Sequence, residues 1–126
     1  YSRLIFLVLF LFTSSSYATE DKEDLFIMMA LDSEKKQNPI KSFKYYDKLY
    51  KNTQKQDYLK KAIFYSYKAQ KFEDMYRLSQ KAIVTFPKYY EYYTQQKIIA
   101  LLSQTKTTQA LKEAKQLLQK KTIKTL

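Results

Sequence analysis

The sequence predicts an all-α fold in which antiparallel helix pairs stack side by side. The chain has no glycine and only two prolines in 126 residues, so it has few residues suited to the tight turns that sheets require. Apolar residues recur at the i, i+3, i+4, i+7 spacing of amphipathic helices. The polar breaks between these segments are short, which favours antiparallel neighbours.

The amino-terminal segment has the layout of an export signal. Arg3 is followed by nine consecutive apolar residues, Leu4–Phe12, and a polar stretch then leads to the small-x-small sequence that ends at Ala18. We therefore expect residues 1–18 to be a signal peptide cleaved after Ala18, and residues 19–126 to form one helical-repeat domain. The alternative is an uncleaved membrane anchor, but a spanning helix needs about 20 apolar residues. Since the first residue is Tyr and not Met, we expect the natural amino terminus to lie upstream.

The first pair of helices is separated by the clearest boundary in the chain. A first helix is predicted from about residue 21 to residue 37, with an inner face of Leu25, Met28, Met29 and Asp32. Asn38 suits a helix cap and the proline after it suits the first helical position, so a second helix is predicted over residues 39–52.

The middle pair has the most regular pattern. Thr53 and Gln56 have the spacing of a capping box, which predicts a third helix reaching about residue 69. Its inner face is predicted as Leu59, Ala62, Ile63 and Ser66. A fourth helix carries Phe72, Met75, Ser79, Ala82, Ile83 and Phe86, and Pro87 marks its end.

The last pair is predicted on either side of a threonine-rich break. A fifth helix spans about Lys88–Ser103. A sixth follows the break, with an apolar stripe made of Ala110, Leu111, Ala114, Leu117 and Leu118.

The second helices of the three pairs share a pattern at relative positions 0, 3, 7 and 10. Their starts, Ile40, Phe72 and Thr107, are 32 and 35 residues apart, and a helix-turn-helix unit of about 34 residues is typical of tetratricopeptide repeats. The chain resembles that family over about residues 23–121. The middle unit, Gln56–Pro87, resembles it most. Its matching positions are Ala62, Phe72, Ala82 and Pro87, whereas Ile63 and Met75 replace small residues and the turn glycine is missing.

The resemblance implies a short right-handed superhelical solenoid whose first helices line a concave groove. On this chain the implied groove contains Lys60, Phe64, Tyr67 and Tyr92, and Tyr93 is added from the tyrosine cluster at residues 89–93. Exposed tyrosines are favoured at binding surfaces because they offer a large contact area at a low entropic cost. The alternative interpretation is that these rings fill gaps between the helices.

Composition excludes several kinds of chemistry. Because cysteine and histidine are absent, there is no thiol nucleophile, Ser-His-Asp triad or His/Cys zinc site. Without glycine there is no P-loop. Catalysis by Asp, Glu, Lys or Tyr alone stays open, but no such constellation is present, so we expect neither an enzyme nor a cofactor.

The net charge of +11 predicts partners that carry negative charge. The expected function is an exported scaffold, periplasmic in a bacterium, that binds a protein or peptide through its groove. A eukaryotic secretory route fits the signal equally. The alternative is electrostatic binding of an anionic envelope polymer or membrane surface. Nucleic acid is disfavoured by the export signal, and no transmembrane span is expected once the signal is removed.

Overall fold

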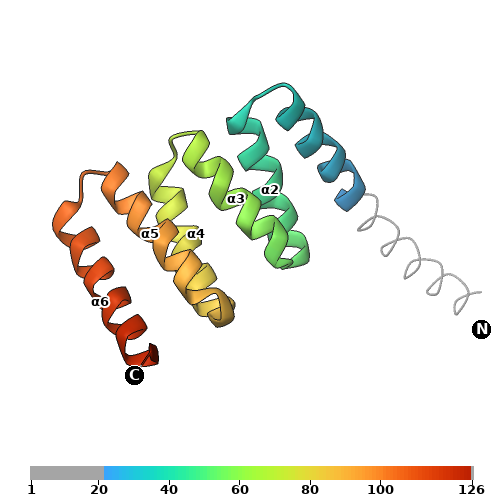
Figure 1. Ribbon diagram of the computed structural model, residues 1–126. Coiled ribbons are helices and arrows are strands. Elements are labelled where there is room, and N and C mark those ends of the chain that lie inside the picture. The colour runs from blue at the N-terminus through green and yellow to red at the C-terminus, as the bar shows by residue number, and fades with distance from the viewer. Residues whose placement is uncertain (1–21, 126) are drawn as a thin grey trace, which may run out of the picture.

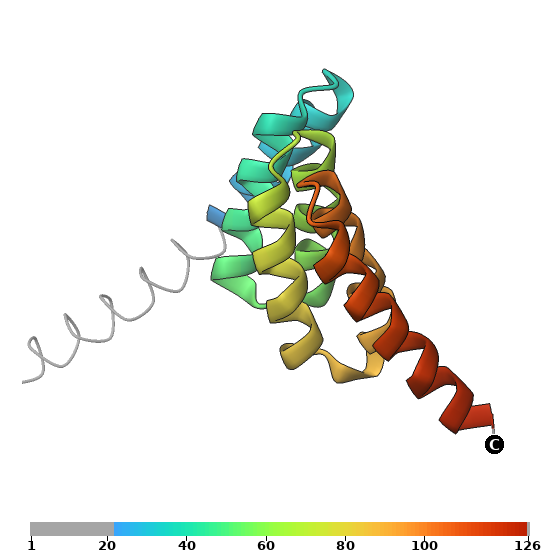
Figure 2. The same cartoon turned by 90° about the vertical axis from the view of Figure 1, so that its left-hand side faces the viewer.

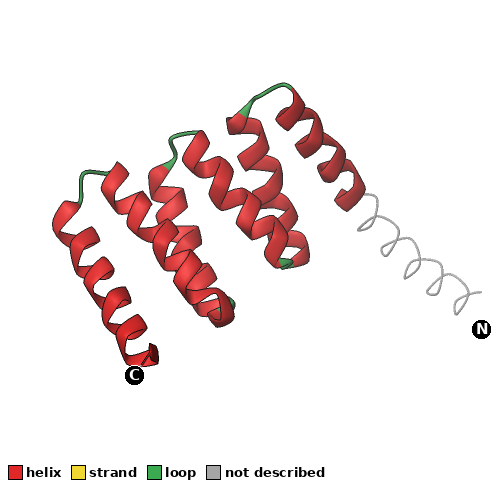
Figure 3. Ribbon diagram, viewed as in Figure 1, coloured by secondary structure: helices red, strands yellow, loops and turns green. Residues whose placement is uncertain are grey.

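The computed structural model describes residues 22–125, and within them the only regular secondary structure is helical (Figure 3). A helix over 22–35 is followed by α2 (Pro39–Thr53), α3 (Gln56–Lys68), α4 (Phe72–Thr85), the 3₁₀ turn η1 (Pro87–Tyr89), α5 (Tyr90–Ser103) and α6 (Thr107–Thr125). The predicted all-α class is therefore confirmed. The predicted signal peptide, residues 1–18, lies outside the described residues.

The helices stack in chain order, each against its sequence neighbour. Close contacts join α2 to α3, α3 to α4, α4 to α5, and α5 to α6. In Figures 1 and 2 the helices run up and down alternately and step from the blue end of the molecule to the red end. They do not gather around one central axis, so the predicted arrangement of consecutive helix pairs in a repeat array is confirmed.

The three turns inside the pairs have the same backbone structure. Gln37, Gln70 and Thr105 have φ angles of 52°, 60° and 60°, and they are 33 and 35 residues apart. In each turn the next amide N–H donates to the carbonyl five residues earlier, at 2.9, 2.8 and 2.9 Å. This is the helix-ending motif that glycine usually serves. The backbone thus repeats even though the side chains at the turn differ.

The core lies along the inner faces of the stacked helices. All four residues predicted to face inward on α3 are buried, as are Met75, Ser79 and Ala82 on α4. Leu78 joins them, although the predicted α4 stripe omitted it. The middle pair therefore has the apolar faces that its sequence pattern predicts.

The inner face predicted for the first helix is wrong. Leu25, Met28 and Met29 are 52%, 67% and 39% exposed, and Asp32 is exposed as well. The inward residues are instead Ala30 and Ser33, which are buried, with Phe26 and Ile27 packed against the core. A buried serine is stable there because its hydroxyl has partners: it donates to the Ala30 carbonyl at 2.7 Å and lies 2.8 Å from the Ser42 hydroxyl.

Of the two predicted helix caps, the one before α2 is confirmed and the one before α3 is wrong. Asn38 caps α2 as predicted, since its side-chain oxygen accepts from the Lys41 amide at 3.2 Å and Pro39 follows it. The predicted capping box is wrong: Thr53 is the last residue of α2 and its hydroxyl donates to the Leu49 carbonyl at 2.7 Å. The cap of α3 is Lys55, without a side-chain hydrogen bond.

The fifth helix begins two residues later than predicted because a separate turn precedes it. Pro87 ends α4 as expected, but the residues from Pro87 to Tyr89 form a 3₁₀ turn, and α5 begins at Tyr90.

Candidate interaction groove

The first helices of the three pairs expose large apolar side chains at equivalent positions. Leu31, Phe64 and Ile99 lie six residues before the left-handed turn residue of their pair, and they are 57%, 46% and 38% exposed. Three equivalent residues of stacked units form a row along one side of the array. We call the side of the first helices that carries this row the groove face.

Four of the five predicted groove residues are on the surface. Lys60 is exposed, and Phe64, Tyr67 and Tyr92 are 46%, 44% and 37% exposed. Tyr93 is a correction, because its side chain is 0% exposed and belongs to the core. The amide of Gln56 donates to its hydroxyl, so a buried phenol here has the partner that it needs.

One hollow of the groove face lies between α3 and α5. It has a volume of about 510 Å³ and is lined by Asp57, Lys60, Lys61, Phe64 and Tyr92. The ammonium of Lys60 lies 5.1 Å from the centre of the Tyr92 ring, within the range of a cation–π contact. The hollow thus combines positive charge with aromatic surface.

The buried Tyr93 supports this hollow from below. Its ring meets that of Tyr92 edge to face, with centroids 5.1 Å apart and planes at 71°, and such pairs stabilise a fixed ring orientation. Burial raises the pKa of Tyr92, so its hydroxyl remains a hydrogen-bond donor at neutral pH. Tyr93 therefore positions a groove residue without reaching the groove itself.

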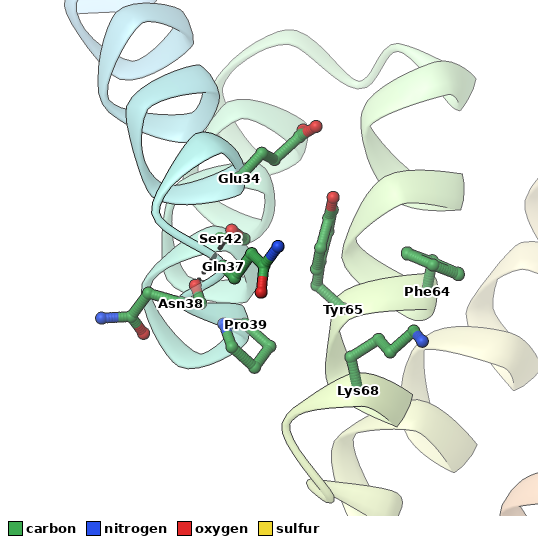
Figure 4. A pocket seen from close by; sticks show the side chains of 8 residues that line it. All are labelled: Glu34, Gln37, Asn38, Pro39, Ser42, Phe64, Tyr65 and Lys68. Carbon is green, nitrogen blue, oxygen red and sulfur yellow. Dashed lines mark hydrogen bonds between the residues drawn. The ribbon is translucent and has the colours of Figure 1, made fainter.

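A second hollow, of about 340 Å³, lies on the other side of α3. Figure 4 shows it between the turn that leads into α2 and the carboxyl-terminal half of α3, with Phe64 and Lys68 together on the α3 side. The Lys68 ammonium lies 5.6 Å from the centre of the Phe64 ring, and the Phe64 ring rests edge-on against Tyr65. Phe64 lines both hollows and is the residue they share.

The deep side of the second hollow is an ordered polar network. In Figure 4 the hydroxyl end of Tyr65 points toward Glu34. The Tyr46 hydroxyl donates to the Glu34 carboxylate, the Tyr46 and Tyr65 rings stack with centroids 5.7 Å apart, and the Lys61 ammonium lies 3.8 Å from Glu34. Burial, and then the adjacent carboxylate, raise the pKa of Tyr46 and of Tyr65 above the ordinary value for tyrosine. The network joins the first helix, α2 and α3, and so fixes the walls of the hollow.

The remaining predicted residue, Tyr67, stands apart from these hollows. Its ring lies 6.1 Å from that of Phe72, at the end of α3 where the chain turns into α4. It extends the exposed aromatic surface of α3 toward the turn.

Several groove residues were missed by the sequence analysis, although two simple signals would have found them. Lys61 lies three residues before Phe64 and Lys68 four residues after it, so both share the side of the helix that carries Phe64. Leu31 and Ile99 follow from applying the repeat spacing to Phe64 in both directions.

In residues 22–125 no group of three or more acidic side chains is placed to hold a metal ion. Over the same range no helix has the length and apolar character needed to cross a bilayer.

The chain was also compared with known proteins, and neither protein-family models, curated proteins nor solved structures match it.

Proposed function

We propose that this chain is an exported, tetratricopeptide-like scaffold that binds a protein segment along its groove face. The proposal is carried by the row of Leu31, Phe64 and Ile99, three exposed apolar residues at equivalent positions of stacked helices. Exposed apolar surface rimmed by polar groups is typical of interaction sites.

The chemistry of the hollows indicates the kind of segment. Lys60 and Lys68 each lie over an aromatic ring beside a hollow, which suits a ligand with carboxylates next to apolar or aromatic side chains. An acidic, aromatic-containing peptide fits both features. Binding without catalysis also agrees with the absence of histidine and cysteine.

Binding to an anionic polymer or membrane surface is the second candidate. It is favoured by the net charge of +11, which attracts any polyanion regardless of shape. The two candidates differ in salt dependence, since attraction between exposed charges weakens strongly as salt rises whereas apolar contact does not.

A pair of charge-matched variants separates the candidates. The groove variant is Lys60→Ala with Phe64→Ala, and the control is Lys81→Ala with Val84→Ala on α4, where Val84 is 81% exposed. Each loses one positive charge and one exposed apolar side chain. Partners captured from envelope extract by the wild type are identified, and the acidic segment they share is titrated as a peptide by calorimetry.

Groove binding predicts that the groove variant loses at least about tenfold in affinity, as aromatic hot spots do, while the control binds like the wild type. If both variants bind equally well and high salt releases the ligand, the groove proposal fails. Vesicles of anionic and of zwitterionic phospholipid, tested in parallel, then measure the electrostatic alternative directly.

The export proposal has its own test. If the chain is exported and processed as the segment pattern indicates, amino-terminal sequencing of the secreted protein finds Thr19 first. Retention of Arg3 in the secreted or membrane-bound product would contradict cleavage.

A further inference from the structure

The second helices use one face to hold the next pair, and this face is covered in the first two pairs. On α2 it carries Phe43 and Tyr50, which are 8% and 1% exposed. Lysines of the following pair lie over both rings: Lys71 at 5.8 Å from Phe43 and Lys81 at 5.3 Å from Tyr50. On α4 the equivalent residues are Tyr76 and Ile83, both partly buried against the core.

Among residues 22–125, no segment covers the same face of α6. Its equivalents of Tyr76 and Ile83, counted from the left-handed turn of each pair, are Leu111 and Leu118. They are 54% and 63% exposed, whereas Ala110 and Leu117, which face the rest of the stack, are buried. The predicted apolar stripe of the sixth helix therefore has one half in the core and one half on the surface. Its outer half has the position that holds the following helix pair on α2 and α4.

The first helix shows the complementary half of that junction. Tyr58 of α3 and Tyr93 of α5 occupy equivalent positions and contact the preceding pair: Tyr58 lies 6.4 Å from the Tyr46 ring, and Tyr93 accepts from Gln56. In the helix over 22–35 this position is Leu25, which is 52% exposed. The next position on the same face, occupied by Lys97 over the Tyr76 ring in the third pair, is Met29, 39% exposed.

The two helices that carry these faces are also opposite in net charge. The first helix, residues 22–35, has four carboxylates and two lysines, whereas α6 has five lysines and one glutamate. Opposite net charges steer the correct ends together and disfavour contact between like ends. Contact between two first helices or between two α6 helices is disfavoured on this ground, and contact between a first helix and α6 is favoured.

We propose that this chain associates head to tail with copies of itself, the 22–35 helix of one copy packing on α6 of the next as α5 packs on α4. The contact repeats the internal junction, so each added copy extends the same stack of helices and the same groove face. Such an interface is heterologous and leaves one free face at each end. The groove proposal does not depend on it.

Two blocking variants test the junction. The tail-blocked variant carries Leu111→Glu and Leu118→Glu, and the head-blocked variant carries Leu25→Lys and Met29→Lys. All four side chains are more than a third exposed, so both variants are expected to keep the wild-type circular dichroism spectrum. A control carries Ile40→Glu and Val84→Glu, which are exposed apolar residues away from both ends.

Sedimentation velocity of the full chain over a wide concentration range gives the readout. The wild type and the control are expected to form species that grow with concentration, and each blocked variant is expected to stay monomeric where the wild type associates. An equimolar mixture of the two blocked variants is expected to form a one-to-one dimer and nothing larger, because only one pair of intact faces is available.

Four results overturn the proposal. They are a monomeric wild type at all concentrations, association that persists in both blocked variants, self-association of the head-blocked variant alone, and a mixture that does not dimerise. The first would arise if a further helix of a longer chain covers α6, the second if another segment drives association, and the third if two α6 faces pair with each other.

Discussion

The helices α4 and α6 follow turns of the same type but differ in which helices pack against them. Each follows a residue in the left-handed conformation, Gln70 before α4 and Thr105 before α6. Near the start of each helix a backbone amide, that of Met75 or Ala110, donates to the carbonyl four residues earlier at 3.0 Å. Yet α4 lies between α3 and α5, whereas α6 packs on α5. The pattern of apolar residues thus defines which faces can be buried, and the neighbours decide which of them are.

The largest expected effect is a contrast between two leucines. Leu78 on α4 is 1% exposed and Leu118 on α6 is 63% exposed. Leu78→Ala leaves a cavity and should lower the free energy of unfolding by about 3 kcal/mol, whereas Leu118→Ala should change it by less than about 0.5 kcal/mol. Urea unfolding followed by circular dichroism, at a concentration where the chain is monomeric, measures both. Equal losses would mean that the outer face of α6 is covered.

The next largest effect concerns the polar network around Glu34, where the first helix pair meets α3. Tyr46→Phe removes the hydrogen bond to the Glu34 carboxylate and should lower the free energy of unfolding by about 2 kcal/mol near neutral pH. The matched control is Tyr67→Phe, on a half-exposed ring of the groove face, which should change little.

The same variant should alter the dependence of stability on pH. The pKa of Tyr46 is raised above its ordinary value of 10.0, so the folded state favours the neutral phenol. Its contribution is present in full below pH 10.0 and is lost as the pH rises toward the raised pKa. The urea midpoint of the wild type should therefore fall more steeply above that pH than the midpoint of Tyr46→Phe. Parallel curves for the two proteins would contradict the assigned network.

The smallest expected effect is a gain in stability when glycine replaces a left-handed turn residue. Gln70→Gly should raise the free energy of unfolding by about 1 kcal/mol, because a left-handed conformation is costly for residues with a β-carbon and not for glycine. Ala69→Gly is the control, since its φ of −82° gives glycine no advantage. Thr105→Gly relieves the same strain beside α6, and a smaller gain there in global unfolding would show that α6 opens separately from the middle of the stack.

The sequence predicted the fold well because most helices have one clear apolar face. It failed on the first helix, where two faces are apolar: the predicted stripe of Leu25, Met28 and Met29 is exposed, and the true inner face is completed by the polar Ser33. Burial of a hydroxyl depends on a partner such as Ser42, which belongs to another helix. Periodicity in one segment carries no information about that partner.

The groove was predicted in part for a similar reason. The resemblance placed Lys60, Phe64 and Tyr92 near one another, and they do line one hollow. Tyr92 and Tyr93 are adjacent residues of the same type, so their identity alone does not show which ring is on the surface and which is in the core. The difference comes from the position of α3, whose Gln56 reaches the Tyr93 hydroxyl.

The contacts between sequence neighbours have a consequence for how the chain folds. Because each helix packs mainly on the helix before it and the helix after it, no long loop has to close before apolar surface is buried, and chains with such local contacts fold fast. Assembly can begin at any helix pair and spread in both directions. Hydrogen exchange should accordingly be slowest in the amides of α3 and α4 and faster toward α6.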